Sequence, residues 1–185
     1  MNVAVILAAG ESRRMGEPKQ LLPFGGKTML QCVIDAFDVE QRLVVLGHQA
    51  DEIAKSIYGT TVVLNPKYRA GMFTSVQAGL RALPAGTKVV LLALCDQPRL
   101  QPVTVKKLVG EFAGKILIPT YKGRQGHPLL FSSRYVAEIL AMDQSLTLKH
   151  FLANHPDEIA RSPVSDEGVL IDIDDRATYD REVRR

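Results

Sequence analysis

Apolar residues gather along the chain in short runs whose spacing predicts the strands of one sheet. Runs of Val, Ile and Leu with little polar alternation are typical of strands that are buried on both faces. The runs are Val3–Leu7, Leu43–Leu46, Val62–Leu64, Val89–Leu94, Ile116–Ile118 and Val169–Ile173. We therefore expect a sheet that lies between layers of helices.

Helical spacing appears between these runs. Leu30, Val33, Ile34 and Phe37 follow the pattern i, i+3, i+4, i+7, and residues 105–112 repeat it. An alternation of buried strands and amphipathic helices indicates right-handed βαβ crossovers. The pattern thus predicts an α/β protein with a three-layer, Rossmann-like fold and a mainly parallel sheet.

The regular alternation loosens after about residue 120. A polar turn at 122–128 is followed by a predicted strand at 129–131 and by helical spacing at Val136, Ile139 and Leu140. No internal repeat or low-complexity linker divides the chain. We expect a single domain over residues 1–185, with a substrate-side insertion at about 120–160.

Composition and charge narrow the class of ligand. The 185 residues are 46% hydrophobic and 23% charged, which is ordinary for a globular protein with a buried core. The formal net charge is +3, and the basic residues do not gather in one run. A nucleic-acid partner would need a clustered basic stripe, so this balance favours a small anionic ligand.

The two cysteines and the first residues of the chain indicate the cellular compartment of the protein. Cys32 and Cys95 lie far apart in apolar segments, which indicates neither a disulfide framework nor a metal site. The apolar start of the chain is too short to span a membrane and has no basic leader. These features favour a cytoplasmic protein without a membrane partner.

The loop after the first apolar run carries the strongest chemical signal. Ligands of open α/β sheets bind at the carboxyl ends of the strands, where the sequence LAAGESRRMGEPK occupies residues 7–19. Small residues let a phosphate approach the backbone N–H groups, and Arg13, Arg14 and Lys19 can neutralise its oxygens. The loop is neither a Walker A nor a Gly-x-Gly-x-x-Gly motif. A structural turn with solvated charges is the alternative.

Carboxylates close two of the apolar runs. Asp96 follows Val89–Leu94, and Mg²⁺ takes one or two such carboxylates and completes its shell with phosphate and water. Asp172 and Asp174 lie at the last run, on one face if it is a strand, and either can complete a metal site with Asp96. The local alternatives are a turn or capping role for Asp96 and helix capping by Asp175.

Two further segments carry weaker signals. The loop NPKYRAGMFTS at 65–75 leads into a helix whose first N–H groups can donate to a base, ribose or phosphate, although an ordinary helix entry fits equally well. His127 lies between a glycine and a proline, either as a hydrogen-bonded turn residue or as a substrate contact. The four histidines show no zinc-ligand spacing, and no Gly-x-Ser-x-Gly elbow is present.

These loops, in this order, resemble the MobA-like nucleotidyltransferase family, and within it the MocA-type molybdenum cofactor cytidylyltransferases. The most specific match is LAAGESRRMG at 7–16 with PKQLLP at 18–23. The motifs NP at 65–66, GM at 71–72 with Ser75, LCDQP at 94–98 and GHP at 126–128 extend it over most of the chain. The resemblance implies a GT-A-like nucleotidyltransferase fold.

The resemblance also implies a role for each matching residue. It places the nucleotide against Leu7, Ala8, Ala9, Gly10, Ser12, Arg14, Lys19, Asn65, Gly71 and Ser75. It makes Arg14, Lys19 and Asp96 catalytic, Asp96 and Asp174 the Mg²⁺ ligands, and His127 a contact of the second substrate. Guanylyltransferase relatives carry a Gly-Gly pair where this chain has Ala8-Ala9-Gly10, which implies cytidine. The chain departs from the family at Asp175-Arg176, where Thr-Pro is common.

The implied reaction is transfer of CMP from CTP to the phosphate of molybdenum-molybdopterin, with release of pyrophosphate. One alternative is a nucleotidyltransferase that uses GTP, or that acts on a sugar or alditol phosphate. Another is a non-catalytic carrier that delivers the molybdenum cofactor to a xanthine dehydrogenase-family enzyme, which is also the partner to which a catalyst can pass its product. An NAD-binding Rossmann module is disfavoured because its glycine fingerprint is absent.

Overall fold

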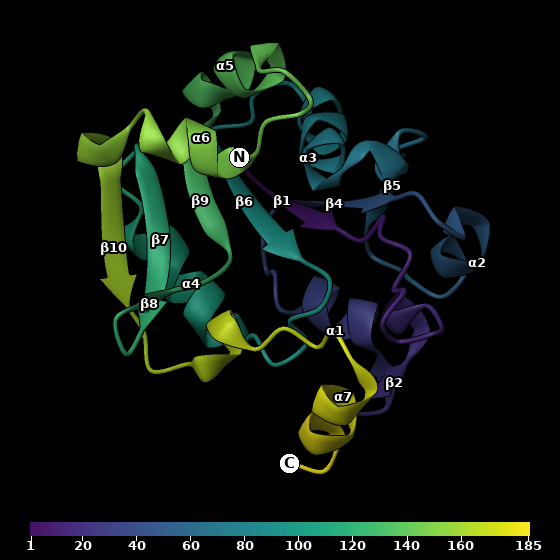
Figure 1. The fold of residues 1–185 in the computed structure, drawn as a ribbon. Helices are drawn as coiled ribbons and strands as arrows, with labels where there is room; N and C mark the ends of the chain where they lie inside the picture. Colours follow the sequence, from purple (N-terminus) through teal and green to yellow (C-terminus); the bar gives the residue numbers. More distant parts are fainter.

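The centre of the molecule is one mostly parallel sheet, seen in a computed structural model that describes residues 1–185 (Figure 1). Its strands are β1 (Asn2–Leu7), β4 (Gln41–Leu46), β5 (Thr61–Leu64), β6 (Val89–Leu94), β7 (Ile116–Tyr121), β8 (Arg124–Gln125), β9 (Leu129–Ser132) and β10 (Ile159–Pro163). They follow the order β10-β7-β9-β6-β1-β4-β5, with β8 paired to β7. Only β8 and β9 run antiparallel to their neighbours. A separate hairpin joins β2 (Pro23–Phe24) to β3 (Lys27–Thr28).

Helices cover both faces of the sheet, as the alternating side chains of β1 show. Ala4 and Ile6 point into one apolar cluster and Val3 and Val5 into another on the opposite face. The first cluster is covered by α1 (Met29–Asp35), α2 (Ala50–Ala54) and α4 (Pro102–Glu111), and the second by α3 (Met72–Arg81), α5 (Val136–Ala141) and α6 (Leu148–Ala153). Figure 1 shows these two helical layers. The predicted three-layer α/β fold is confirmed.

The last apolar run, Val169–Ile173, is not a strand, so that prediction is wrong. Its first residues lie in the 3-10 helix η5 (Glu167–Leu170), and the rest is irregular. Val169 and Ile173 are buried, but they pack against the α4 face and against α7 (Arg176–Val183) instead of entering the sheet. The last strand of the sheet is β10, which pairs with β7. Apolar runs report burial, and burial alone does not select a strand.

The second difference concerns the edge of the sheet. Val62–Leu64 lies in β5, which pairs only with β4. Leu64 retains 62% of its exposure, so this strand is not buried on both faces as its composition predicts. An apolar run indicates strand structure, while the position of a strand in the sheet decides how far it is buried.

The segment at about 120–160 contributes to the sheet as well as to its surface. β9 lies between β6 and β7, in the interior of the sheet, and α5 and α6 cover one face. The turn at 122–128 and the stretch between α5 and α6 contribute residues to a large cavity described below. The segment expected to be an insertion therefore supplies an interior strand of the sheet and two of the helices that cover it.

Candidate active site

The loop after β1 holds an open shape that exposes backbone donors. The buried Gln20 side chain donates through Nε2 to the carbonyls of Ala8, at 2.9 Å, and Gly10, at 3.1 Å. Ser12 Oγ donates to Gln20 Oε1 and accepts from the Lys19 N–H, which closes the loop on itself. None of the N–H groups of residues 9–12 donates to another protein group. A loop that presents several free N–H groups is suited to bind an anion.

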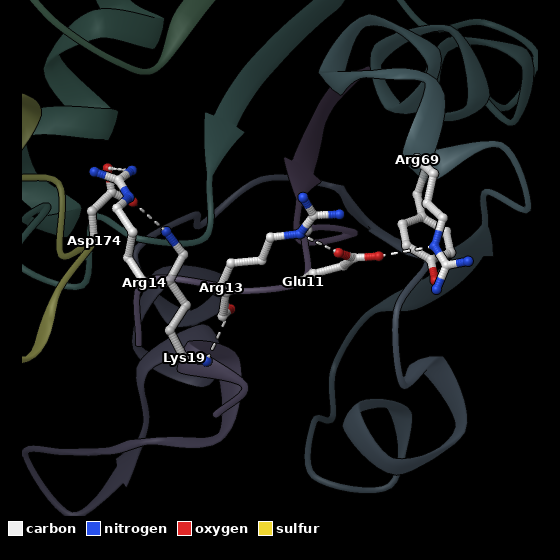
Figure 2. A pocket seen from close by; sticks show the side chains of 9 residues that line it. Glu11, Arg13, Arg14, Lys19, Arg69 and Asp174 are labelled. Atoms are coloured by element: carbon white, nitrogen blue, oxygen red, sulfur yellow. Dashed lines mark hydrogen bonds and ion pairs between the residues drawn. The ribbon is translucent and has the colours of Figure 1, made fainter. Parts of the chain in front are cut away.

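A lysine and two carboxylates meet beside this loop. Lys19 begins the 3-10 helix η1 (Lys19–Leu21), and its Nζ lies 2.7 Å from Asp96 Oδ2 and 2.7 Å from Asp174 Oδ1. Arg14 Nη2 donates to the other oxygen of Asp174, also at 2.7 Å. Figure 2 shows Arg14 and Lys19 converging on Asp174. The structure thus brings together the predicted catalytic residues and both predicted metal ligands.

Backbone pairing at the sheet edge explains this convergence. The Cys95 N–H donates to the Leu7 carbonyl at 3.1 Å, so the ends of β6 and β1 lie side by side. The Ile173 N–H donates to the Asp96 carbonyl at 2.9 Å, which sets the late segment against the end of β6. Asp175 then caps α7, accepting from the Thr178 N–H at 2.7 Å as the sequence predicts.

The two late aspartates, which the sequence left as alternatives, take different places. Asp172 Oδ1 accepts from the Gln97 Nε2 at 2.8 Å. Gln97 is buried and also donates to the Val169 carbonyl, so it ties this segment to the end of β6. Asp174, and not Asp172, shares the Lys19 ammonium with Asp96.

Burial and charge act against each other in this cluster. Burial raises the pKa of Asp96 above its usual range, against the opposing effect of the Lys19 ammonium. The pKa of Asp174 is lowered, because Lys19 and Arg14 outweigh its partial burial. Burial by itself lowers the pKa of Lys19, but Cys95, Asp96 and Asp174 together raise it well above its ordinary value. Lys19 is therefore protonated at neutral pH.

The same carboxylates have the chemistry of a divalent-cation site. Asp96 Oδ1 is buried and has no hydrogen-bond partner, and a second oxygen of Asp96 and one of Asp174 already converge on a single cationic nitrogen. No group of three or more His, Cys, Asp or Glu side chains is arranged to hold a metal. Two carboxylates that need phosphate or water to complete the shell fit Mg²⁺ or a similar hard cation.

A cavity of about 400 Å³ opens in front of the loop. Basic side chains come from both of its walls, and the cavity is lined by Gly10, Glu11, Ser12, Arg13, Arg14, Lys19, Tyr68, Arg69 and Asp174. Leu7, Ala8 and Ala9 are buried, and their side chains do not line this cavity. A strongly cationic cavity beside free N–H groups is suited to a polyphosphate.

Within the 65–75 loop, Tyr68 and Arg69 line the cationic cavity, whereas Asn65, Gly71 and Ser75 do not. Asn65 and Ser75 are buried, and Asn65 Nδ2 donates to Thr74 Oγ1 and Ser75 Oγ, both at 2.9 Å. These bonds fix the entry of the chain into α3, and neither side chain lines the cationic cavity. Gly71, whose φ is 117°, lines a second cavity instead.

This second cavity is larger and mostly apolar. It has a volume of about 600 Å³, and its wall includes Leu7, Gly71, Leu94, His127 and Leu152. His127 Nδ1 is buried without a hydrogen-bond partner, and burial lowers the pKa of the ring. The cavity meets the sheet edge at Leu7 and Leu94, one and two residues from Ala8 and Asp96. The second cavity therefore opens at the same edge of the sheet as the 7–19 loop and Asp96.

Three residues of the site have no counterpart in the sequence analysis. Gln20 shapes the loop, and Glu11 and Arg69 face each other across the cationic cavity. The only sequence signal for Gln20 is an uncharged polar residue between Lys19 and the apolar end of the PKQLLP motif. Arg69 lies far from the loop in sequence, so only the fold places it there.

Asp166 fixes the chain just before η5 and so determines where Asp174 arrives. It is buried, and it accepts from the N–H groups of Gln101 and Gly168, both at 2.9 Å, and from Thr104 Oγ1 at 2.8 Å. The backbone here is tightly packed, since a Cβ on Gly168 would lie 2.4 Å from the Arg99 carbonyl oxygen.

We expect Asp166→Ala to lower the free energy of unfolding by about 2–4 kcal/mol, because it leaves three buried donors without their charged acceptor. Urea unfolding followed by circular dichroism measures this change. Asp157→Ala removes an exposed carboxylate with no hydrogen bond and serves as the control, with a change below about 0.5 kcal/mol. Equal effects of the two substitutions would contradict the anchoring role.

Solved structures with the same fold define the class of protein. A nucleotidyl transferase from Methanothermobacter thermautotroptrophicus superposes with a TM-score of 0.85 and 26% identity, over 100% of this chain and 96% of that one. Rv0371c from Mycobacterium tuberculosis, in complex with manganese, superposes with a TM-score of 0.83 and 25% identity, over 99% of this chain and 98% of that one. The fold is the GT-A-like fold of nucleotidyltransferases. Fold and site together define a nucleotidyltransferase.

Sequence comparison names the family. The model of the MobA-like NTP transferase domain matches residues 4–159, and the chain belongs to this family. It is 32% identical to molybdenum cofactor cytidylyltransferase from Escherichia coli, over 69% of this chain and 68% of that protein. It is 31% identical to nicotine blue oxidoreductase from Paenarthrobacter nicotinovorans, over 92% of this chain and 90% of that protein. The resemblance found in the motifs is confirmed.

None of the helices is both long and apolar enough to cross a lipid bilayer.

Proposed function

We propose that this protein transfers CMP from CTP to the terminal phosphate of molybdenum-molybdopterin, forming molybdopterin cytosine dinucleotide and pyrophosphate. The whole chain acts as one domain, and the loops of the 120–160 segment supply part of the acceptor site. The observation that carries the proposal is the cationic cavity, where free N–H groups, Arg14 and Lys19 lie next to the paired carboxylates Asp96 and Asp174.

The triphosphate of CTP is assigned to this cavity. The N–H groups of residues 9–12 donate to its oxygens, and Arg14 and Lys19 balance its charge. The choice of CTP rests on the Ala8-Ala9-Gly10 sequence and on the similarity to a molybdenum cofactor cytidylyltransferase. Asn65 and Ser75 support the nucleoside side of the site by fixing the 65–75 loop.

Asp96 and Asp174 are the residues that would hold Mg²⁺, and a related structure contains manganese. When bound, a divalent cation offsets the negative charge of the phosphates. The chain itself supplies a cation, Lys19, within reach of both the carboxylates and the cavity. Arg14 adds a second positive charge on the open side of Asp174.

The acceptor is assigned to the apolar cavity. Its phosphate is largely ionised at neutral pH, since the second pKa of a phosphomonoester is about 6, so the reaction needs no strong general base. The main task of the chain is to align two anions that repel each other and to offset the charge that grows on the leaving pyrophosphate. His127, neutral and without a partner at Nδ1, is available to hydrogen-bond the acceptor. We place the protein in the cytoplasm, with a xanthine dehydrogenase-family enzyme as the recipient of the product.

The similarity to nicotine blue oxidoreductase supports a second candidate, a redox enzyme of the same fold. The shared fold and an apolar cavity are compatible with a flat aromatic substrate. The cationic cavity and the paired carboxylates favour phosphoryl chemistry, because the reduction of an aromatic dye does not require them.

The test is to incubate the protein with Mg²⁺, molybdenum cofactor and each of CTP, GTP, ATP and UTP, and to measure pyrophosphate and the dinucleotide. We expect both products with CTP, and neither without the cofactor. Product with GTP only would overturn the cytidine assignment, and product with a sugar phosphate in place of the cofactor would change the acceptor. A change in the redox state of nicotine blue without pyrophosphate would favour the redox enzyme, and no product at all would favour a carrier.

A further inference from the structure

Glu11 is an acidic residue in the middle of a basic cavity. Its Oε2 accepts from Arg13 Nε at 2.6 Å and its Oε1 accepts from Arg69 Nε at 2.9 Å. Each carboxylate oxygen is thus engaged by a different arginine. These two hydrogen bonds lower the pKa of Glu11, so the carboxylate is ionised at neutral pH. Figure 2 shows Glu11 between the two arginines, at the end of the cavity away from Asp174.

Arg69 reaches the cavity from the wall opposite the loop. It belongs to the 3-10 helix η2 (Tyr68–Ala70), and its guanidinium lies 5.6 Å from the centre of the Tyr68 ring. Tyr68 is held close to the backbone, since a Cβ on Gly47 would lie 2.6 Å from Tyr68 Cβ. Tyr68 is only half-buried, and the Arg69 side chain beside it retains 73% of its exposure. Arg69 can change its partner without any change in the fold.

Glu11 is more enclosed than the arginines that it binds. Its side chain retains 18% of its exposure, against 83% for Arg13 and 73% for Arg69. The Glu11 side chain bonds only to the side chains of Arg13 and Arg69, while Gln20 and Ser12 hold the backbone of the loop. Through its two ion pairs, Glu11 neutralises Arg13 and Arg69, which would otherwise lie unpaired in the cavity.

We propose that Arg69 is a ligand of the polyphosphate chain and that Glu11 is its exchangeable counter-ion. In the free protein Glu11 holds Arg69 and Arg13, and in the complex phosphate oxygens replace the carboxylate on Arg69. The inference rests on the proposed binding of a nucleoside triphosphate in this cavity. It assigns polyphosphate binding to both walls of the cavity, and not to the 7–19 loop alone.

The effect of Glu11 on polyphosphate affinity differs between an exchangeable counter-ion and a fixed ion pair that holds the two walls together. If Glu11 competes with phosphate for Arg69, removal of its charge frees the arginine and also removes repulsion between two anions. Polyphosphate binding then becomes tighter. If the Glu11–Arg69 pair instead holds the two walls in place, removal of the carboxylate loosens the cavity and binding becomes weaker. The sign of the change separates the two possibilities.

The experiment measures binding of inorganic tripolyphosphate and of CTP by calorimetry, at low ionic strength and without an acceptor. We expect Arg69→Gln to weaken binding of both ligands roughly tenfold, which is the effect of losing one charge-assisted hydrogen bond. Arg161→Gln removes an exposed arginine of β10, at the opposite edge of the sheet, and serves as the control for net charge. Its effect is expected to stay below about twofold.

Glu11→Gln keeps the shape of the side chain and removes its charge. We expect it to tighten tripolyphosphate binding several-fold, and we expect Arg69→Gln to cost more in the Glu11→Gln background than in the wild type. The reason is that Arg69 then loses only its phosphate bond, with no compensating loss in the free state. Circular dichroism of the Glu11→Gln and Arg69→Gln variants verifies that each retains the fold.

The outcomes separate this inference from the proposed function. Weaker binding by Glu11→Gln, or unchanged tripolyphosphate binding by Arg69→Gln, overturns the exchange while CTP remains a substrate. The expected shifts with tripolyphosphate, together with no transfer from CTP, support the exchange and contradict the proposed reaction. A wild-type protein that binds neither ligand overturns both.

Discussion

Asp96→Asn is expected to lower the release of pyrophosphate from CTP at least roughly a hundredfold, because the proposed site loses one of the two carboxylates that would hold the divalent cation beside the phosphates. The carboxylate sits at the end of β6, and one of its oxygens is buried without a partner. Asparagine has nearly the same shape, so the fold is retained. Steady-state kinetics with saturating Mg²⁺ and CTP, and a thermal melt of each variant, provide the measurement.

The two late aspartates give this prediction its matched controls. We expect Asp174→Asn to resemble Asp96→Asn, because both carboxylates bind the same Lys19 ammonium. Asp172→Asn leaves an oxygen that still accepts from Gln97, so its activity is expected to stay within about fivefold of wild type. A severe loss in Asp172→Asn with an active Asp174→Asn would move the second ligand to Asp172.

Lys19→Met is expected to have the second large effect, a fall in turnover of roughly a hundredfold or more. Methionine keeps much of the length of the side chain but removes its charge. The same substitution leaves Asp96 and Asp174 close together without their shared cation. We therefore expect Mn²⁺ to bind more tightly to the nucleotide-free variant than to the nucleotide-free wild type, as electron paramagnetic resonance can measure.

The control for this variant is Lys106→Met, which removes an exposed lysine of α4 that makes no ion pair. Its turnover and its Mn²⁺ affinity are expected to match those of the wild type. If Lys19→Met loses activity while its metal affinity is unchanged, the lysine acts on the phosphates alone. If its turnover is normal, Lys19 has no role in the reaction.

Two of the functional segments lie where the sequence places them, because strand ends of a parallel sheet share one edge. Residues 7–19 and Asp96 follow adjacent strands, β1 and β6, and their meeting could be predicted from the apolar runs. The position of Asp174 could not be predicted in the same way. It depends on the Ile173–Asp96 backbone bond and on the anchor at Asp166, both between segments distant in sequence. Glu11 and Arg69 meet for the same kind of reason, across 58 positions.

The sequence by itself determined the layers, most of the strands and helices, and the residue types that can bind phosphate and a cation, because periodicity and loop chemistry are local properties. Only the tertiary structure decided that Val169–Ile173 leaves the sheet, that Asp174 rather than Asp172 shares Lys19 with Asp96, and that Arg69 closes the cationic cavity. These results depend on contacts between residues far apart in the chain, and such contacts are fixed by packing and leave no periodic trace in the sequence.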